Sequence, residues 1–353
     1  MSMNVIPPLA ITTAMLTSAG AYEIAPAAYA SGTSYSLNAD VSVAGAAGLI
    51  AIYRSLQNAN IGHTPAISPT WWKVLSTTYQ VYSGGTTYAQ GDRALDTTTH
   101  RVYESLAGSN LGNVQSDETK WKDVGPTNPW AMFDVLRNTA TVQASALTAV
   151  ITPGVRIDSL ALLGLAATSA TISMTSGGVT VYTVTINLNL RIVLNWYDYF
   201  FAAFRTQESI ALFDLPPYSN GVVTVALSNT GGNVECGACV MGMKQNIGDV
   251  QYEAESDVLN FSTVTRDADG TAEMVQERNV PKTISSIYLD KRFVNQVRAL
   301  RDALNGTPAV WAGIDDDGDD YFEALLILGF YRRFTINLKL PLEAVISLEL
   351  EEV

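Results

Sequence analysis

Residues 103–134, YESLAGSNLGNVQSDETKWKDVGPTNPWAMFD, combine aromatic side chains with glycine turns and two X-Pro dipeptides. The first part of this stretch repeats an earlier one at an offset of fifty residues. Seven residues recur within 22 ungapped positions: Tyr53 as Tyr103, Ser55 as Ser105, Leu56 as Leu106, Asn60 as Asn110, Gly62 as Gly112, Trp71 as Trp121 and Val74 as Val124. Chance alignments rarely keep Tyr, Asn, Gly and Trp in one register, so the chain contains a duplicated module.

The similarity continues upstream of both copies. Tyr35 and Asp40 precede the first copy, and Tyr88 and Asp92 precede the second at nearly the same spacing. Each copy spans about 45 residues of strand and turn. Because a unit of that size buries little apolar surface, we expect the copies to lean on each other or on the rest of the chain.

Composition limits the classes of function. A length of 353 residues favours two or three domains, and 47% hydrophobic against 16% charged residues favours sizeable cores. The net charge of −13 argues against nucleic-acid binding, which needs clustered Lys and Arg. So few charges favour a protein that hides much of its surface in an assembly.

The N-terminal residues are apolar, but they are not typical of a membrane or secretion signal. No run of 18 apolar residues is free of breakers, so we expect no membrane insertion. No Lys or Arg precedes Arg54, and Pro7 and Pro8 interrupt the first apolar run, unlike in a signal peptide. We predict that residues 1–30 are mature sequence forming an arm that docks on a neighbour.

The remaining pattern predicts a mainly β fold. Short β-prone runs separated by turn signals follow residue 139, as in a sandwich or jelly roll. One helix is predicted from residue 290 to residue 304, with its buried stripe at Phe293, Val297, Leu300 and Leu304. The predicted organisation is an arm at 1–30, tandem β modules at 31–80 and 81–125, a jelly-roll-like β-sandwich at 126–250, and a C-terminal β-rich α+β domain with one clear helix at 251–353.

Catalytic motifs are missing from the sequence. His63 and His100 are the only histidines, and neither a G-x-S-x-G elbow nor a phosphate-binding glycine loop occurs. Glycoside hydrolysis needs only two carboxylates, and the 34 acidic residues leave it open without singling out a pair. We therefore predict that the chain is not an enzyme and needs no cofactor.

Two clusters resemble metal sites at first sight. Cys236 and Cys239 form a single C-x-x-C without a second pair, which favours two small core residues over a zinc or redox site. Asp315, Asp317 and Asp319 surround a glycine, but no ligand stands where an EF-hand loop places its last one. We predict no metal and a solvated turn, with an irregular calcium site at these aspartates as the alternative.

Aromatic residues are the candidate binding groups. An exposed Trp or Tyr can stack on the apolar face of a sugar, while polar neighbours bond its hydroxyls. The candidates for such carbohydrate binding are Tyr88, Tyr103 and Trp121 in the second copy and Tyr53, Trp71 and Trp72 in the first. The alternative is that these rings form the core of each module. The aromatic cluster at 195–204 likewise fits a core plug or an interface patch better than a ligand platform.

The copies resemble small chitin-binding-type carbohydrate-binding modules. The shared pattern is Tyr-x-x-Gly-Asp, a strand, Tyr-x-Ser or Tyr-x-Ala, and a closing Trp. The second copy matches it with Tyr88, Gly91, Asp92, Tyr103 and Trp121. In the first copy no Gly precedes Asp40, which makes glycan binding there more doubtful.

The junction KWKDVGPTNPWAMFD resembles a signature of bacteriophage virion proteins, in which such modules precede a long β-rich region. RIDSLALLGL, DLPPY and the final LGFYRRFTINLKLP agree with that resemblance. It implies a structural component of a phage tail (baseplate, tail tip or fibre-attachment layer), made in the host cytoplasm and located in the virion. The implied partners are other tail proteins, further copies of the chain and host-surface polysaccharide. The alternatives are a dedicated glycan-binding adhesin and, least favoured, a glycan-cleaving enzyme.

Overall fold

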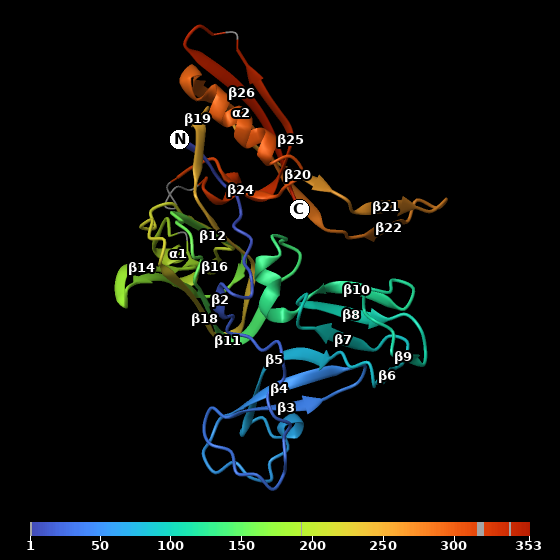
Figure 1. The fold of residues 1–353 in the computed structure, drawn as a ribbon. Helices are drawn as coiled ribbons and strands as arrows, with labels where there is room; N and C mark the ends of the chain where they lie inside the picture. The colour runs from blue at the N-terminus through green and yellow to red at the C-terminus, as the bar shows by residue number, and fades with distance from the viewer. Residues whose placement is uncertain (1, 192, 316–320, 339) are drawn as a thin grey trace.

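The computed structural model describes residues 2–191, 193–315, 321–338 and 340–353, and its fold is mainly β, as predicted. Three large sheets contain most of the strand residues. The sheet built from the repeats lies at one end of the molecule, a central β body follows, and the C-terminal domain with helix α2 (Val294–Ala303) lies at the other end (Figure 1).

The two repeats form one continuous six-stranded sheet. Its order is β10-β8-β7-β5-β4-β3, and β5 pairs with β7 in parallel to join the copies. This pairing covers an edge strand of each small unit and confirms the prediction that the two copies pack against each other. The elements are β3 (Asp40–Ala44), β4 (Leu49–Ser55), η1 (Pro65–Ile67), β5 (Trp72–Val81), β6 (Thr87–Tyr88), β7 (Arg93–Asp96), β8 (Arg101–Ser105), β9 (Asn110–Leu111) and β10 (Trp121–Pro126).

The central body is a β-sandwich whose two layers share one long strand, β18 (Val222–Gly242). The first part of β18 pairs with β11 and β13, and its last part pairs with β12. One hydrophobic core includes Leu160 and Leu162 of β12 together with Ile172 and Met174 of β13. The further elements are β2 (Leu16–Ser18), η2 (Asn128–Phe133), β11 (Thr141–Ile151), β12 (Ser159–Ala166), β13 (Ser169–Ser176), β14 (Val179–Asn187), β15 (Asn189–Leu190), α1 (Trp196–Phe201), β16 (Arg205–Thr206) and β17 (Ser209–Leu212).

The C-terminal domain is a closed barrel. Its strands follow the order β19-β1-β24-β25-β26-β23, and β19 also pairs with β23, which closes the ring. Val297 of α2 and Leu304, which follows the last residue of α2, pack into the barrel core. The elements are β1 (Ser2–Ile6), β19 (Gln245–Val250), β20 (Glu255–Asn260), β21 (Thr263–Arg266), β22 (Ala272–Val275), β23 (Asn279–Asp290), η3 (Lys291–Phe293), β24 (Ala309–Ala312), η4 (Glu323–Leu325), β25 (Leu326–Asn337) and β26 (Glu343–Glu352).

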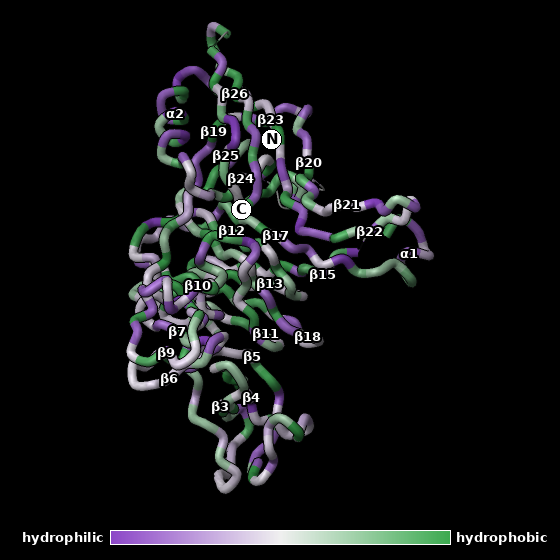
Figure 2. Tube along the Cα trace, turned by 90° about the vertical axis from the view of Figure 1, so that its right-hand side faces the viewer, coloured by the Kyte–Doolittle hydropathy of each residue, from purple (hydrophilic) through white to green (hydrophobic). Residues whose placement is uncertain are grey.

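Strand β12 lies between the sandwich core and the barrel. Leu160 and Leu162 face the sandwich core, whereas Ala161 and Leu163 pack against barrel residues that include Val310 and Leu328. Successive strand residues point to opposite faces, so a strand covered on both sides is apolar throughout. This explains the run SLALLGLA, and Figure 2 shows hydrophobic chain concentrated in this region.

Three sequence predictions need correction. The N-terminal arm was predicted to dock on a neighbouring chain, but its strand β1 pairs with β19 and β24 of its own chain, and Val5 is fully buried. The sandwich ends at β18 rather than at residue 250, because β19 belongs to the barrel. The predicted helix starts with the 3₁₀ turn η3, and Phe293 of its expected buried stripe is 49% exposed.

Candidate functional site

In the second module, two of the predicted binding rings, Tyr88 and Trp121, are buried and form an aromatic triad with the half-buried Tyr82. Tyr82 stacks on Tyr88 with ring centroids 5.9 Å apart, and Trp121 meets both rings edge-on. The Trp121 indole donates to the Asn113 carbonyl over 3.0 Å, and the Ser83 amide donates to the Tyr88 hydroxyl over 2.8 Å. Tyr88 is 1% exposed and Trp121 is 2% exposed. Neither ring can stack on a sugar, which corrects the platform interpretation in favour of the core alternative.

The first module repeats this triad with Tyr29, Tyr35 and Trp72. Tyr29 stacks on Tyr35 at 5.8 Å, and Trp72 meets both rings edge-on. The Trp72 indole donates to the His63 carbonyl over 2.7 Å, just as Trp121 donates to Asn113. Trp72 is buried, so it too is module core.

The strand pairing shows that Trp72, and not Trp71, is the counterpart of Trp121. Trp72 pairs with Ser55, and Trp121 pairs with Ser105. The first copy therefore has one extra residue between its glycine turn and its Trp, and the fixed offset of fifty fails after that turn. Trp71 is half-buried and stacks on His63 at 3.8 Å.

The remaining two candidates, Tyr53 and Tyr103, are half-buried on equivalent strands β4 and β8. Tyr103 borders a hollow of about 370 Å³ together with Tyr82, Asp96 and Gln115. The Asp96 carboxylate already accepts from the Thr98 amide and the Thr99 hydroxyl. The six predicted residues thus do not converge on one surface.

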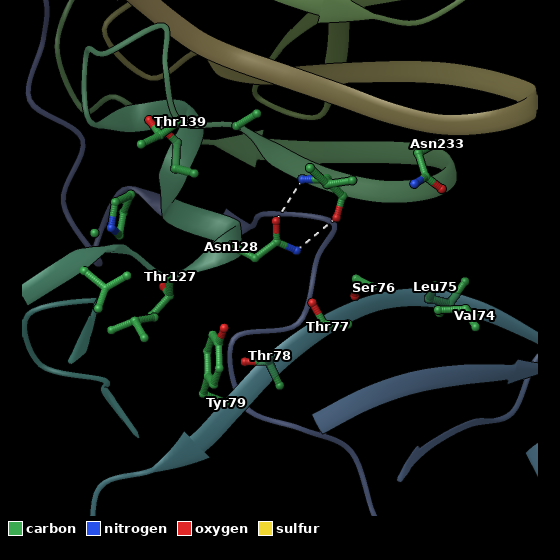
Figure 3. A pocket seen from close by; sticks show the side chains of 17 residues that line it. Val74, Leu75, Ser76, Thr77, Thr78, Tyr79, Thr127, Asn128, Thr139 and Asn233 are labelled. Atoms are coloured by element: carbon green, nitrogen blue, oxygen red, sulfur yellow. Dashed lines mark hydrogen bonds between the residues drawn. The ribbon is translucent and has the colours of Figure 1, made fainter. Parts of the chain in front are cut away.

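A larger groove, of about 580 Å³, lies between the module sheet and the sandwich (Figure 3). Strand β5 forms one wall, and η2, β11 and the bend of β18 form the other. Its described lining residues carry no carboxylate, ammonium, guanidinium or imidazole group. They are Val74, Leu75, Ser76, Thr77, Thr78, Tyr79, Val102, Val124, Gly125, Pro126, Thr127, Asn128, Ala131, Thr139, Ala140, Val142 and Asn233.

Some polar groups of this groove are hydrogen-bonded within the protein, and others are not. Asn128 is fixed, because its side chain donates to the Val142 carbonyl over 2.9 Å and accepts from the Val142 amide over 2.8 Å. The side chains of Thr77 and Asn233 make no hydrogen bond within the described residues, and the buried Ser76 Oγ has no partner. Figure 3 shows Thr77 on β5 facing the bend that carries Asn233. The groove therefore offers neutral hydrogen-bonding groups beside valine and proline surface.

A polar cluster around Glu23 holds the two walls together, since the Thr78 hydroxyl on β5 donates to the Glu23 carbonyl over 2.5 Å. His100 Nδ1 lies 2.9 Å from Glu23 Oε1, and the Thr127 hydroxyl donates to the same oxygen over 2.7 Å. His100 also stacks on Trp130 with ring centroids 3.9 Å apart. These contacts join the N-terminal segment, the second module and η2, so the groove has a fixed width at that end.

The aromatic cluster of the sequence forms a projecting loop, named here the aromatic loop (residues 193–204). A two-residue stem of β15 and β16 carries it, and α1 lies at its tip. Trp196 is 79% exposed, Phe200 is 66% exposed and Phe201 is 70% exposed. The core-plug interpretation is therefore wrong, and Figure 2 shows the loop extending from the side of the body.

The metal candidates gain no support from the geometry. Asp317 and Asp319 lie outside the described residues, and Asp315 is exposed. Within residues 2–191, 193–315, 321–338 and 340–353, no group of three or more His, Cys, Asp or Glu side chains is placed to hold a metal ion. Cys236 and Cys239 are unpaired and buried, and burial raises the pKa of the Cys239 thiol to about 12. They behave as core residues, as predicted.

Comparisons add no relative to this picture. The chain matches no protein-family model, no curated protein and no solved structure. Among the described helices, none combines the length and apolar character needed to cross a membrane.

The groove and the Glu23 cluster were not foreseen from the sequence. Thr77 and Asn233 lie far apart along the chain, and each is an ordinary strand or turn residue in its own context. Only the docking of the module sheet on the sandwich brings them together. The NWYDYFFAAF run did signal the aromatic loop, because six aromatic residues within ten positions exceed what a short surface segment needs.

Proposed function

We propose that the chain is a non-catalytic structural subunit of a bacteriophage tail, in the baseplate, tail tip or fibre-attachment layer. The observation that carries this proposal is the aromatic loop. Soluble monomers rarely leave contiguous large apolar side chains in water, and such patches usually mark interaction sites. A short helix that exposes Trp196, Phe200 and Phe201 together needs a partner surface that covers them.

The loop is organised for contact. Asn195 accepts from the Asp198 amide and so caps α1, while the Arg191 guanidinium lies 5.4 Å from the Tyr199 ring centroid and 5.1 Å from that of Phe204. Tyr and Trp rings of this kind supply large contact area at low conformational cost. The resemblance of residues 103–134 to virion proteins supports a phage tail as the setting of that contact.

Cryo-electron microscopy of intact phage particles tests the proposal. We expect the chain in the tail, with the aromatic loop buried against a neighbouring subunit. Phages carrying Trp196→Ser, Phe200→Ser and Phe201→Ser together should assemble tails that lack the chain, while the purified variant stays folded because these side chains have no core role. Tyr252→Ser, at a 94% exposed ring elsewhere, is the matched control. Native particles that lack the native chain, or normal incorporation of the triple variant, would contradict the proposal.

A second candidate function is binding of a neutral saccharide in the groove between the module sheet and the sandwich. Sugar sites combine apolar contact with a few placed hydrogen-bonding groups. Thr77 and Asn233 offer unused groups of that kind beside Val74 and Val124. This places glycan binding, as a proposal, away from the module triads that the sequence suggested.

A glycan array probed with the purified full chain tests this second candidate. Thr77→Val and Asn233→Ala should each weaken binding about tenfold, as expected when one net hydrogen bond to a ligand is lost. Trp71→Ala, outside the groove, should leave the affinity unchanged. Loss of binding in Trp71→Ala with full binding in the groove variants would move the site back to the modules.

A further inference from the structure

A long β hairpin projects from the barrel into solvent. It starts with β20 paired to the first half of β23 and continues as β21 paired to β22. Every described residue of β21 and β22 is exposed, including Val264, Met274 and Val275. Figures 1 and 2 both show it leaving the body sideways. We name residues 255–278 the β arm.

The β arm is apolar at intervals and strongly acidic. Over residues 255–278 it carries six carboxylates and two arginines, of which Arg278 pairs with Glu352: Glu255, Asp257, Asp267, Asp269, Glu273, Glu277, Arg266 and Arg278. Its strands pair only with each other and with β23 among the described elements, so their outer edges are free. Exposed strand edges with apolar side chains are typical of segments that dock on another chain.

The opposite end of the barrel carries the complementary surface. Residues 291–301 contain four basic side chains and no acid, in a chain of net charge −13. Two of the four are engaged nearby, because Arg292 pairs with Asp290 and Arg301 pairs with Asp302. Arg298 has no hydrogen bond or ion pair within the described residues, and the Lys291 ammonium donates only to the Pro341 carbonyl among them.

Apolar groups lie beside these basic residues. Phe293 is 49% exposed, and Leu338 and Leu342 at the turn between β25 and β26 are each 69% exposed. The Lys291 amide donates to the Leu342 carbonyl over 3.1 Å, which places the turn against the start of the helix. We name this combination of the α2 start with Leu338 and Leu342 the receiving surface.

Strand β23 connects the two surfaces and sets their separation. It leaves the β arm at Asn279 and reaches the receiving surface at Asp290. At about 3.3 Å per residue, its ends lie about 36 Å apart, on opposite sides of the barrel. In one chain the tip of the β arm and the receiving surface therefore lie beyond opposite ends of β23, and the pairing of β20 with β23 holds the arm in that direction.

From this complementarity we infer that the β arm of one copy docks on the receiving surface of a second copy. Acidic and apolar groups of the arm meet basic and apolar groups of the neighbour, which favours this orientation over arm-to-arm contact. Such a contact is head-to-tail, so it generates a ring when the rotation closes and a filament when it does not. The inference rests on the proposed structural role and specifies how copies would join within a tail layer.

Sedimentation of the purified full-length chain tests the contact without a phage. We expect concentration-dependent self-association that added salt weakens, because the opposing charges are exposed. Asp267→Lys with Glu273→Lys in the arm, or Lys291→Glu with Arg298→Glu in the receiving surface, should each raise the apparent dissociation constant at least about tenfold. Glu118→Lys with Lys122→Glu, exposed on the second module, is the matched control and should change nothing.

Mixing the two reversed variants gives the decisive result. Each alone presents like charges on both surfaces, whereas an equimolar mixture restores opposite charges at every contact, so we expect it to associate like the native chain. A native chain that stays monomeric, reversals without effect, or a mixture that stays dissociated would each overturn the inference. None of these results touches the proposed tail role, which incorporation through the aromatic loop tests separately.

Discussion

Asp40 and Arg93 occupy the same position in the two modules with opposite charge. Asp40 faces Arg54 across β3 and β4, and Arg93 faces Glu104 across β7 and β8, with N–O distances of 2.7 and 2.8 Å. The duplicated unit has therefore kept a cross-strand ion pair while reversing its direction. The pair matters more to the fold than the identity of either partner.

Reversing the first pair should be tolerated only when both partners change. Asp40→Arg alone replaces a carboxylate side chain that is only 8% exposed with a guanidinium group that faces the one of Arg54. This change should lower the free energy of unfolding by about 1–3 kcal/mol. Asp40→Arg with Arg54→Glu should recover most of that loss, although the bond from the Tyr22 hydroxyl to Asp40 is lost. A double-mutant cycle by urea denaturation measures the coupling, and additive effects would contradict it.

The turn at Gly48 should be intolerant of any side chain because it touches the second module. Gly48 has φ +77°, and an added Cβ would lie 2.2 Å from the Arg93 carbonyl oxygen. Gly62 has φ +75° with open space around it. Gly48→Ala should therefore lower the melting temperature clearly more than Gly62→Ala, because both substitutions carry the same backbone strain and only the first adds the contact with Arg93. Equal shifts for both variants would show that the modules can separate at this turn without cost.

Loss of Trp121 should act on stability, not on a binding face. Trp121→Ala removes a 2% exposed indole and leaves a cavity among Tyr82 and Tyr88, which typically costs about 3–5 kcal/mol. Trp71→Ala removes a half-buried ring and should cost much less. Denaturant unfolding followed by near-ultraviolet circular dichroism compares the two. A small loss for Trp121→Ala would mean that the triad is not the module core.

The sequence indicated the duplicated module but not the segments that pack against it, because the repeated residues make contacts within one copy. Asn60 and Asn110 repeat because each amide donates to the preceding Ser hydroxyl and to a backbone carbonyl, contacts local to one copy. Likewise Asn38 takes the left-handed conformation that Gly91 takes, so a missing glycine did not mean a missing turn. By contrast, the β5–β7 pairing, the insertion of β1 into the barrel and the Thr77–Asn233 groove depend on contacts between distant segments. Local periodicity and spacing carry no information about such contacts.

Two partly buried carboxyl groups, those of Glu351 and Asp134, should give the stability opposite pH dependences. The hydrogen bond from Arg332 holds the pKa of Glu351 below its usual value, so this contribution is present at neutral pH and is lost as the pH falls through that lowered pKa. Burial raises the pKa of Asp134, although Thr139 and Leu136 donate to it. In that case the folded state holds the proton more tightly, so stability falls as the pH rises from the usual Asp value through the raised pKa.

Melting temperatures between pH 4 and pH 7 separate these effects. Glu351→Gln should become progressively more destabilising as the pH rises, because the ion pair it removes is then fully formed. Asp134→Asn should become progressively more stabilising over the same range, since its amide oxygen can still accept from the Leu136 amide and its amide nitrogen can donate to the Thr139 hydroxyl oxygen without carrying a charge. Glu118→Gln, exposed and without a hydrogen bond among the described residues, is the control and should give a flat difference. Parallel pH curves for Glu351→Gln and Asp134→Asn would contradict the assigned directions.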